Sequence, residues 1–230
     1  MDKIGEWQFD SNITPLFDEY VQAHVPSYDI IHDFVIKLGA WFLENGSVVY
    51  DIGTSLGAVI RNLKAAYPNR DVKYIGIDTS SSMFLEAAKR FEGEQDVTLY
   101  CADIRDENTT IKNACLVTAV LSLMFIPKKD RQSVIKKVYD GLNPGAAFIV
   151  VEKVRGNGAH INEIYNDLYH DMKLDAGVSK TEIFDKAQSI RGVLRPCSIN
   201  ENIELLKAAG FREVDTFFQL GNFAGFIAIK

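Results

Sequence analysis

The fold of this 230-residue chain is decided by the stretch VVYDIGTSLGA, residues 48–58. Its first half is an apolar, β-branched run that stops at Gly53, which predicts a buried strand. Residues 57–67, GAVIRNLKAAY, place their apolar side chains on one helical face, and Pro68 ends the segment. A strand that turns at glycine into an amphipathic helix is the repeating unit of a parallel α/β sheet.

The same alternation continues outward from this unit. Further strands are predicted at 72–78, 97–103, 114–122 and 146–154, with helices at 81–91 and from Pro127 onward. Two strands at 216–220 and 223–230 flank Gly221-Asn222, a dipeptide that favours a tight hairpin turn. The prediction is therefore an α/β fold with a Rossmann-like, doubly wound, mostly parallel seven-stranded sheet, closed by an antiparallel C-terminal hairpin.

Two helical segments depart from this rhythm. Residues 1–45 precede the sheet and are expected to form an N-terminal helical lid, broken at Pro15 and Pro26. Residues 158–192 are predicted to be a pair of helices inserted after the fifth strand, and a capping box from Ser198 to Glu201 starts the next helix. Without linkers or repeats, residues 1–230 are expected to form a single domain.

Composition excludes several classes of protein. The net charge of −6 and the pI near 5.3 argue against stable direct binding of nucleic acid through bulk charge. No apolar run reaches the roughly 18 residues of a membrane span, and the N-terminus does not have the pattern of a signal peptide. Three widely spaced cysteines without a Cys/His cluster predict reduced thiols, no metal and a cytoplasmic location.

Three consecutive strand ends carry residues suited to a nucleoside. Gly53 allows a tight turn and a close approach of the backbone to a ligand, and Gly57 allows close packing of the following helix. Asp78, at the end of the second strand, is placed to accept hydrogen bonds from ribose hydroxyls, and Asp103, at the end of the third, from an adenine amino group. Each acid alone is also compatible with a solvated helix cap. Together they describe S-adenosylmethionine better than NAD, whose glycine pattern is matched poorly, and a P-loop is excluded.

The motifs DIGTSLG (51–57), GIDTSSSM (76–83) and ADIRD (102–106) resemble those of class I S-adenosylmethionine-dependent methyltransferases. The chain is similar, over nearly its whole length, to the carboxy-S-adenosylmethionine synthase family, which serves wobble-uridine modification of tRNA. The resemblance is carried further by short motifs spread along the chain: Trp7-Gln8-Phe9-Asp10, Val25-Pro26-Ser27-Tyr28, the run Gly141 to Gly145, Glu152-Lys153, His170-Asp171, and Gln219 to Phe223.

The resemblance implies a set of cofactor contacts at the matching positions. Together with the strand-end reasoning, it gives the predicted S-adenosylmethionine site as Tyr28, Asp51, Gly53, Thr54, Ser55, Gly57, Asp78, Thr79, Asp103, Ile104 and Val120. Tyr28 would present its aromatic face to the sulfonium cation, although a simple core role is the alternative.

Two positions depart from the family. Val120 stands where the family has an asparagine that contacts the cofactor. Ala187 stands where the family has an arginine, supplied across a homodimer, that pairs with the extra carboxylate of carboxy-S-adenosylmethionine. Arg191 and Arg195 are the nearby cations that are able to replace it. The departures predict that the chain does not efficiently make carboxy-S-adenosylmethionine.

The leading hypothesis is therefore a methyltransferase that acts on an unidentified small molecule. The alternative is synthesis of carboxy-S-adenosylmethionine from S-adenosylmethionine and prephenate, and a third is a non-catalytic S-adenosylmethionine-binding protein. Candidate catalytic residues on the acceptor side are Tyr165, Tyr169, His170 and Arg195, all in or just after the inserted helices. Apolar residues recur at helical spacing in the inserted segment, and the family that the chain resembles is dimeric. Together these two observations predict a homodimer.

Overall fold

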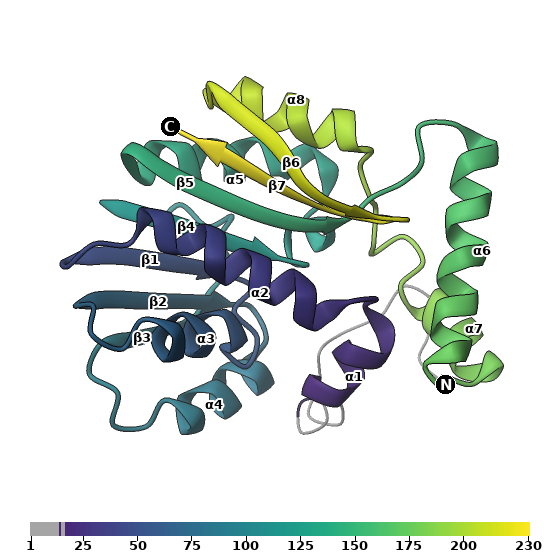
Figure 1. Cartoon of the computed structure of the whole chain (residues 1–230), viewed down its shortest axis with the longest axis horizontal. Coiled ribbons are helices and arrows are strands. Elements are labelled where there is room, and N and C mark those ends of the chain that lie inside the picture. The colour runs from purple at the N-terminus through teal and green to yellow at the C-terminus, as the bar shows by residue number, and fades with distance from the viewer. Residues whose placement is uncertain (1–13, 15–16) are drawn as a thin grey trace.

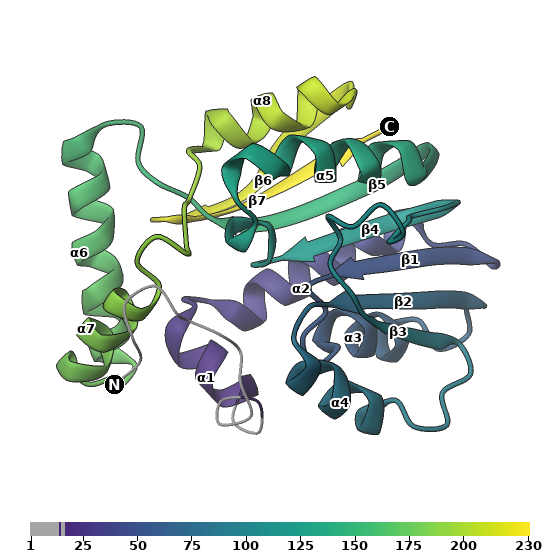
Figure 2. The same ribbon diagram turned by 180° about the vertical axis from the view of Figure 1, so that it is seen from behind.

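The chain forms a seven-stranded mixed sheet with helices on both faces (Figures 1 and 2). The structure, a computed structural model, describes Thr14 and residues 17–230. The strands lie in the order β3-β2-β1-β4-β5-β7-β6; β1 to β5 are parallel, and β7 is antiparallel to both of its neighbours. The predicted α/β class and the doubly wound sheet are confirmed.

The strands follow the predicted runs closely. Their bounds are β1 Ser47–Ile52, β2 Val72–Asp78, β3 Val97–Cys101, β4 Ala114–Val120, β5 Leu142–Lys153, β6 Glu213–Leu220 and β7 Phe223–Ile229. Two strands begin earlier than predicted: β6 starts at Glu213 rather than 216, and β5 starts at Leu142 rather than 146. Leu142 pairs with Ala114, but the register then shifts so that Ala147 pairs with Leu116, and the intervening Asn-Pro-Gly is accommodated as an irregularity.

The C-terminal hairpin closes the sheet with an antiparallel edge, as predicted. The strand order within it was not predicted: β7 lies between β5 and β6, and β6 is the edge strand. Residues of β7 are mostly buried, whereas residues of β6 are half-buried or exposed. The more apolar strand therefore occupies the inner position, because it has sheet on both sides.

The helices also match their predicted segments. Their bounds are α1 Phe17–His24, α2 Tyr28–Gly39, α3 Ala58–Ala66, α4 Ser81–Arg90, α5 Lys128–Gly141, α6 Ala159–Asp175, α7 Lys180–Ser189 and α8 Ile199–Ala209, with short 3-10 turns η2 Ala40–Phe42 and η3 Leu123–Phe125. The capping box of α8 is present, since the Ser198 and Glu201 side chains each accept a hydrogen bond from the other's backbone N–H. The break at Pro26 separates α1 from α2; Pro15 and the motif at residues 7–10 lie outside the described residues.

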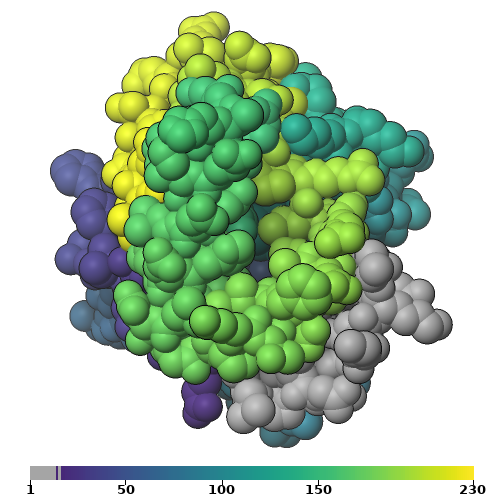
Figure 3. All heavy atoms as spheres, turned by 90° about the vertical axis from the view of Figure 1, so that its right-hand side faces the viewer, coloured from purple at the N-terminus to yellow at the C-terminus, as the bar shows by residue number. Residues whose placement is uncertain are grey.

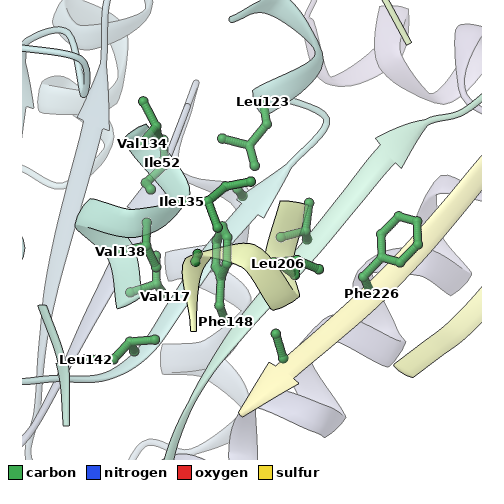
Figure 4. Packing of buried hydrophobic residues seen from close by; sticks show 14 of the residues in the cluster. Ile52, Val117, Leu123, Val134, Ile135, Val138, Leu142, Phe148, Leu206 and Phe226 are labelled. Carbon is green, nitrogen blue, oxygen red and sulfur yellow. The ribbon is translucent and has the colours of Figure 1, made fainter. Parts of the chain in front are cut away.

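Two apolar clusters hold the layers together. Side chains of α2 and α3, such as Val35 and Leu63, pack on one face of the sheet. On the other face α5 and α8 contribute Val138 and Leu206, which pack around Phe148 of β5 (Figure 4). Burial of this kind is the main stabilising contribution to a sheet covered on both sides.

The inserted helices do not cover either face. In Figure 1, α6 and α7 stand beyond the end of the sheet toward which the parallel strands run, and α1 lies to their left, nearer the sheet. Figure 3 looks onto this end, where the green α6 and α7 cover much of the surface. They close off the end of the sheet at which a doubly wound fold binds ligands.

A buried arginine ties this end of the sheet to the segment after α7. The Arg131 guanidinium donates to the carbonyl oxygens of Met124 and Arg195 at 2.9 and 2.8 Å, and it contacts Cys197 Sγ at 3.2 Å. Glu152 of β5 is buried near this cation, and its Oε1 has no hydrogen-bond partner among the described residues. Burial raises the pKa of Glu152 to about 8, against a smaller opposing effect of Arg131.

Glu152→Gln should therefore change how stability depends on pH. In the wild type the unfolded chain releases this proton from pH 4.5 upward, while the folded chain keeps it until about pH 8. The free energy of unfolding should consequently fall as pH rises through this window, by up to about 1.4 kcal/mol per pH unit. Urea unfolding at pH 5, 6 and 7, followed by circular dichroism, should show the variant gaining on the wild type at each step. An unchanged difference between the two proteins across these pH values would contradict the assignment.

Candidate functional site

A cavity of about 870 Å³ opens at the carboxyl ends of β1 to β5. The sheet contributes its floor, and α1, α2, α6 and α7 contribute its walls. Ten of the eleven predicted cofactor positions line it: Tyr28, Asp51, Gly53, Thr54, Ser55, Asp78, Thr79, Asp103, Ile104 and Val120. The structure thus brings together residues that are spread over nearly a hundred positions of sequence.

The loop after β1 is held in a fixed shape. Gly53 adopts φ +70°, and a Cβ at this position would lie 2.4 Å from the Cβ of Ser122, so that only glycine fits without displacement. The Gly53 and Thr54 N–H groups both donate to the carbonyl oxygen of Ile77, at 2.8 and 3.1 Å. The tight turn predicted at Gly53 is confirmed, and its cause is contact with the end of β4 as well as backbone geometry.

Gly57 does not line the cavity. It is the N-cap of α3 with φ +77°, and a Cβ there would lie 2.2 Å from the ring of Phe91. The close packing predicted for this glycine is present, but its partner is an aromatic ring after α4. Its role in this structure is to seat α3, and it supports the cofactor loop only indirectly.

Asp51 lies beneath the loop, at the end of β1. Its side chain is buried, and Thr118 Oγ1 of β4 donates to Asp51 Oδ1 at 2.7 Å. Burial raises the pKa of Asp51 to about 6, and the hydrogen bond from Thr118 opposes this shift. The carboxylate therefore joins β1 to β4 at the cavity floor.

Asp78 connects the first two strand ends. Asp78 Oδ2 accepts a hydrogen bond from the Ser55 N–H at 2.8 Å, and Asp78 Oδ1 accepts one from the Ser80 N–H at 2.8 Å. Burial raises the pKa of Asp78, while these backbone hydrogen bonds lower it. Each carboxylate oxygen retains a lone pair for a ligand hydroxyl. The residue thus shapes the loop and faces the cavity at the same time.

Asp103 has a partner that the sequence did not reveal. Arg105, two residues on, donates to the Asp103 carboxylate through Nε at 2.9 Å and Nη2 at 2.5 Å. This pairing lowers the pKa of Asp103 and keeps it ionised. Ile104, between the two, is buried. An adenine amino group bound at Asp103 would share the carboxylate with Arg105.

The wall built by α1 and α2 carries an aromatic pair. Tyr28, the first residue of α2, packs against His32 one turn later, with ring centroids 4.3 Å apart. His32 is buried against the cavity, and neither of its ring nitrogens has a hydrogen-bond partner among the described residues. Burial lowers the pKa of His32 to about 4, so that the ring is neutral. His32 was not predicted as a site residue, because on sequence alone it is one more residue on an amphipathic helix.

The wall built by β5 and α6 carries a cationic cluster. The ammonium groups of Lys153 and Lys173 each lie 4.1 Å from the centroid of the Tyr169 ring. Burial lowers the pKa of Lys153 to about 7 and that of Lys173 to about 8. The Tyr169 hydroxyl donates to the carbonyl oxygen of His24 at 2.7 Å and joins α6 to α1.

The predicted acceptor-side residues separate into two groups. Tyr169 and His170 line the cavity, whereas Tyr165 and Arg195 do not. Arg195 is exposed, and its Nε donates to the nearby Gly192 carbonyl oxygen at 2.9 Å. Arg191, the other cation considered as a substitute for the missing arginine, is also exposed and outside the lining. Ala187, the position of that arginine, is in the lining.

The cavity fits S-adenosylmethionine on its own chemistry. The glycine turn at Gly53 leaves the backbone of the loop accessible, and the Asp78 and Asp103 carboxylates offer acceptors at neighbouring strand ends. The orphaned nitrogens of His32 add a further buried polar position for a ligand. The remaining predicted contact, Val120, contributes an apolar side chain where an amide was expected from the family pattern.

Comparisons with known proteins place the chain in a family. Residues 49–145 match the family model described as "Methyltransferase domain". The chain is 41% identical over 226 residues to the carboxy-S-adenosyl-L-methionine synthase of Staphylococcus epidermidis, covering 98% of this chain and 97% of that protein. The chain belongs to the carboxy-S-adenosyl-L-methionine synthase family. The same-named protein of Shewanella oneidensis is 34% identical, covering 99% and 94% of the two chains.

Membership of this family shows an S-adenosylmethionine-dependent transferase of class I fold. Among solved structures, Haemonchus contortus phosphoethanolamine N-methyltransferase 2 in complex with S-adenosyl-L-methionine superposes with a TM-score of 0.69 at 14% identity, covering 97% of this chain and 58% of that one. That likeness supports the fold alone. No helix in the described part of the chain is long and apolar enough to cross a membrane, and no cluster of three metal-ligating side chains occurs there.

Asp78→Ala should weaken binding of S-adenosylhomocysteine by about 1–3 kcal/mol, or roughly 5- to 150-fold, because charge-assisted hydrogen bonds to the ligand and to the loop are lost together. Isothermal titration calorimetry measures this directly. The matched control is Asp71→Ala, which removes an exposed carboxylate just before β2, at the other end of that strand. Equal affinities in the wild type and the Asp78 variant would rule out this position as a cofactor contact.

Proposed function

We propose that this chain makes carboxy-S-adenosylmethionine from S-adenosylmethionine and prephenate, in the cytoplasm. The observation that carries the proposal is the similarity to proteins of that name along almost the whole of both chains. This favours the second of the three hypotheses over the first, methyl transfer to an unidentified small molecule. Val120 and Ala187 depart from the family pattern and are the two residues that favour the first hypothesis.

The net chemistry sets what the residues must do. Prephenate would lose its ring carboxylate and its ring hydroxyl and become aromatic, the carboxylate passing to the methyl carbon bound to sulfur. The methyl proton and the hydroxide would leave as water. S-adenosylmethionine supplies a methyl group made acidic by the neighbouring sulfonium. A donor with two carboxylates calls for cations in the cavity, and the cluster of Lys153 and Lys173 provides them.

In this proposal the strand ends bind and orient the nucleoside. Asp78 would hold the ribose and Asp103 the adenine, with the loop at Gly53 receiving the amino-acid end. Residues 1–230 would act as one domain, with the described helices within 1–45 and the insertion at 158–192 roofing the cavity. Exclusion of water by such a roof favours transfer to carbon over loss of carbon dioxide.

Methyl transfer stays a second candidate because of one observation. Ala187 lines the cavity where the family's carboxylate-binding arginine is expected, and an alanine side chain cannot pair with an anion. Methyl transfer needs only an oriented acceptor and the same cofactor contacts.

The deciding experiment is incubation of the purified protein with S-adenosylmethionine and prephenate, followed by mass spectrometry of the nucleosides. We expect catalytic formation of a product heavier than S-adenosylmethionine by one carboxyl group in place of hydrogen. Reactions lacking prephenate are the control. Unchanged S-adenosylmethionine with both substrates present would overturn the proposal, and S-adenosylhomocysteine formed with an added acceptor would support methyl transfer.

We further propose a homodimer that uses α6. Ile161, Ile164 and Leu168, at a spacing of three and four residues, are each at least 37% exposed on this helix. Apolar side chains aligned in this way favour a protein partner over water. Light scattering at tens of micromolar should give twice the chain mass, and Leu168→Glu should shift it toward the monomer. A wild-type monomer would contradict the prediction.

A further inference from the structure

Tyr169 is the centre of an arrangement of charges that neither the fold nor the cofactor explains. Two ammonium groups, from Lys153 at the end of β5 and Lys173 on α6, lie at the same 4.1 Å from its ring centroid. Lys173 is only 6% exposed. The Tyr169 hydroxyl donates a hydrogen bond to the His24 carbonyl oxygen, and this bond fixes the ring beside the two ammonium groups.

Neither ammonium group has an anionic partner at ion-pair distance within residues 14 and 17–230. The Glu182 carboxylate of α7 attracts the Lys173 ammonium group electrostatically, but it is beyond ion-pair distance from it. Glu182 Oε1 lies 3.7 Å from His24 Nε2 instead. Two like charges placed close together and partly desolvated are unfavourable unless an anion compensates them. Contact with an aromatic ring offsets only part of this cost.

The position of the cluster matches the transferred group. With Asp78 holding the ribose and Asp103 the adenine, as proposed above, the nucleoside would lie over β2 and β3, and its reacting end would point toward β4 and β5. Val120 at the end of β4 pairs in register with Val151, and Lys153 lies two residues further along β5. Both lysines line the same cavity as the cofactor positions, and so does Ala187 on α7.

We infer that Lys153 and Lys173, positioned by Tyr169, form the binding site for the carboxylate carried by the product, and so replace the arginine that is missing at Ala187. This inference rests on the proposed function. Two ammonium groups from different elements would do what one guanidinium does elsewhere in the family, with less geometric selectivity, and a bound carboxylate would favour the charged form of both lysines. Neither Arg191 nor Arg195 is then needed to replace the missing arginine, which agrees with their exposed positions outside the cavity.

The test compares two nucleosides by isothermal titration calorimetry. Carboxy-S-adenosylmethionine carries the extra carboxylate, and S-adenosylhomocysteine does not. Lys153→Met and Lys173→Met keep most of the side-chain volume and remove the charge. Each should lose at least tenfold in affinity for the carboxylated nucleoside and stay within twofold of the wild type for S-adenosylhomocysteine. Lys173→Arg should retain affinity for both.

Lys136→Met is the matched control, since Lys136 also lies over a tyrosine ring, Tyr139 at 5.5 Å, but on the exposed side of α5. Its affinities should equal those of the wild type. Unchanged binding of the carboxylated nucleoside in both lysine-to-methionine variants, or a loss in Lys173→Arg as large as in Lys173→Met, would overturn the inference. Equal losses for both nucleosides would also overturn it, because they would indicate a general effect on the fold.

Turnover separates this inference from the proposed function. If the wild type makes no carboxylated product from prephenate, the proposed function fails, whatever the binding data show. If the wild type turns over and both methionine variants bind and react normally, only the assignment of the lysines fails.

Discussion

The site depends above all on the Asp78 carboxylate and on the hydrogen bonds that it accepts from two backbone N–H groups. One belongs to Ser55, in the loop after β1, and the other to Ser80, at the cap of α4. A single, partly buried side chain thereby joins two strand ends and the start of a helix. Buried carboxylates are unfavourable unless they are hydrogen-bonded, so the loop must adopt this shape for the fold to tolerate the charge. The two backbone hydrogen bonds offset the desolvation of the Asp78 carboxylate, and they leave it in the lining of the cavity with lone pairs for a ligand.

The charges in the cavity are segregated. Carboxylates of Asp51, Asp78 and Asp103 gather at the ends of β1 to β3, and ammonium groups gather at β5 and α6. A ligand that fits both ends carries hydroxyl and amino donors at one end and an anionic group at the other. A carboxylated nucleoside sulfonium has this polarity, which agrees with the function that we propose.

The substitution at Ala187 removes a residue type on which the family pattern relies. An arginine contributes a charge, a fork of donors and a long side chain from α7. In the arrangement that we propose, the positive charge comes instead from the neighbouring helix α6 and from the end of β5, where Lys173 is buried and lies over the ring of Tyr169. Lys153 and Lys173 lie far from Ala187 in the sequence, so the sequence pattern around position 187 shows the missing arginine but not the lysines beside the cavity.

The sequence by itself determined the sheet, the helices and the cofactor end of the cavity. Alternation of β-branched runs with amphipathic stretches is a local pattern, and strand ends in a parallel sheet must meet at one edge, so Gly53, Asp78 and Asp103 were predictable as neighbours. Only the tertiary structure decided that β7 lies inside β6, that Arg105 pairs with Asp103, and that His32 faces the cavity. It also decided which residues of the insertion reach the cavity, bringing in Tyr169, His170 and Lys173 and leaving out Tyr165 and Arg195. These outcomes depend on how helices sit at the end of the sheet, and that follows from packing between segments far apart in the chain, which no local spacing encodes.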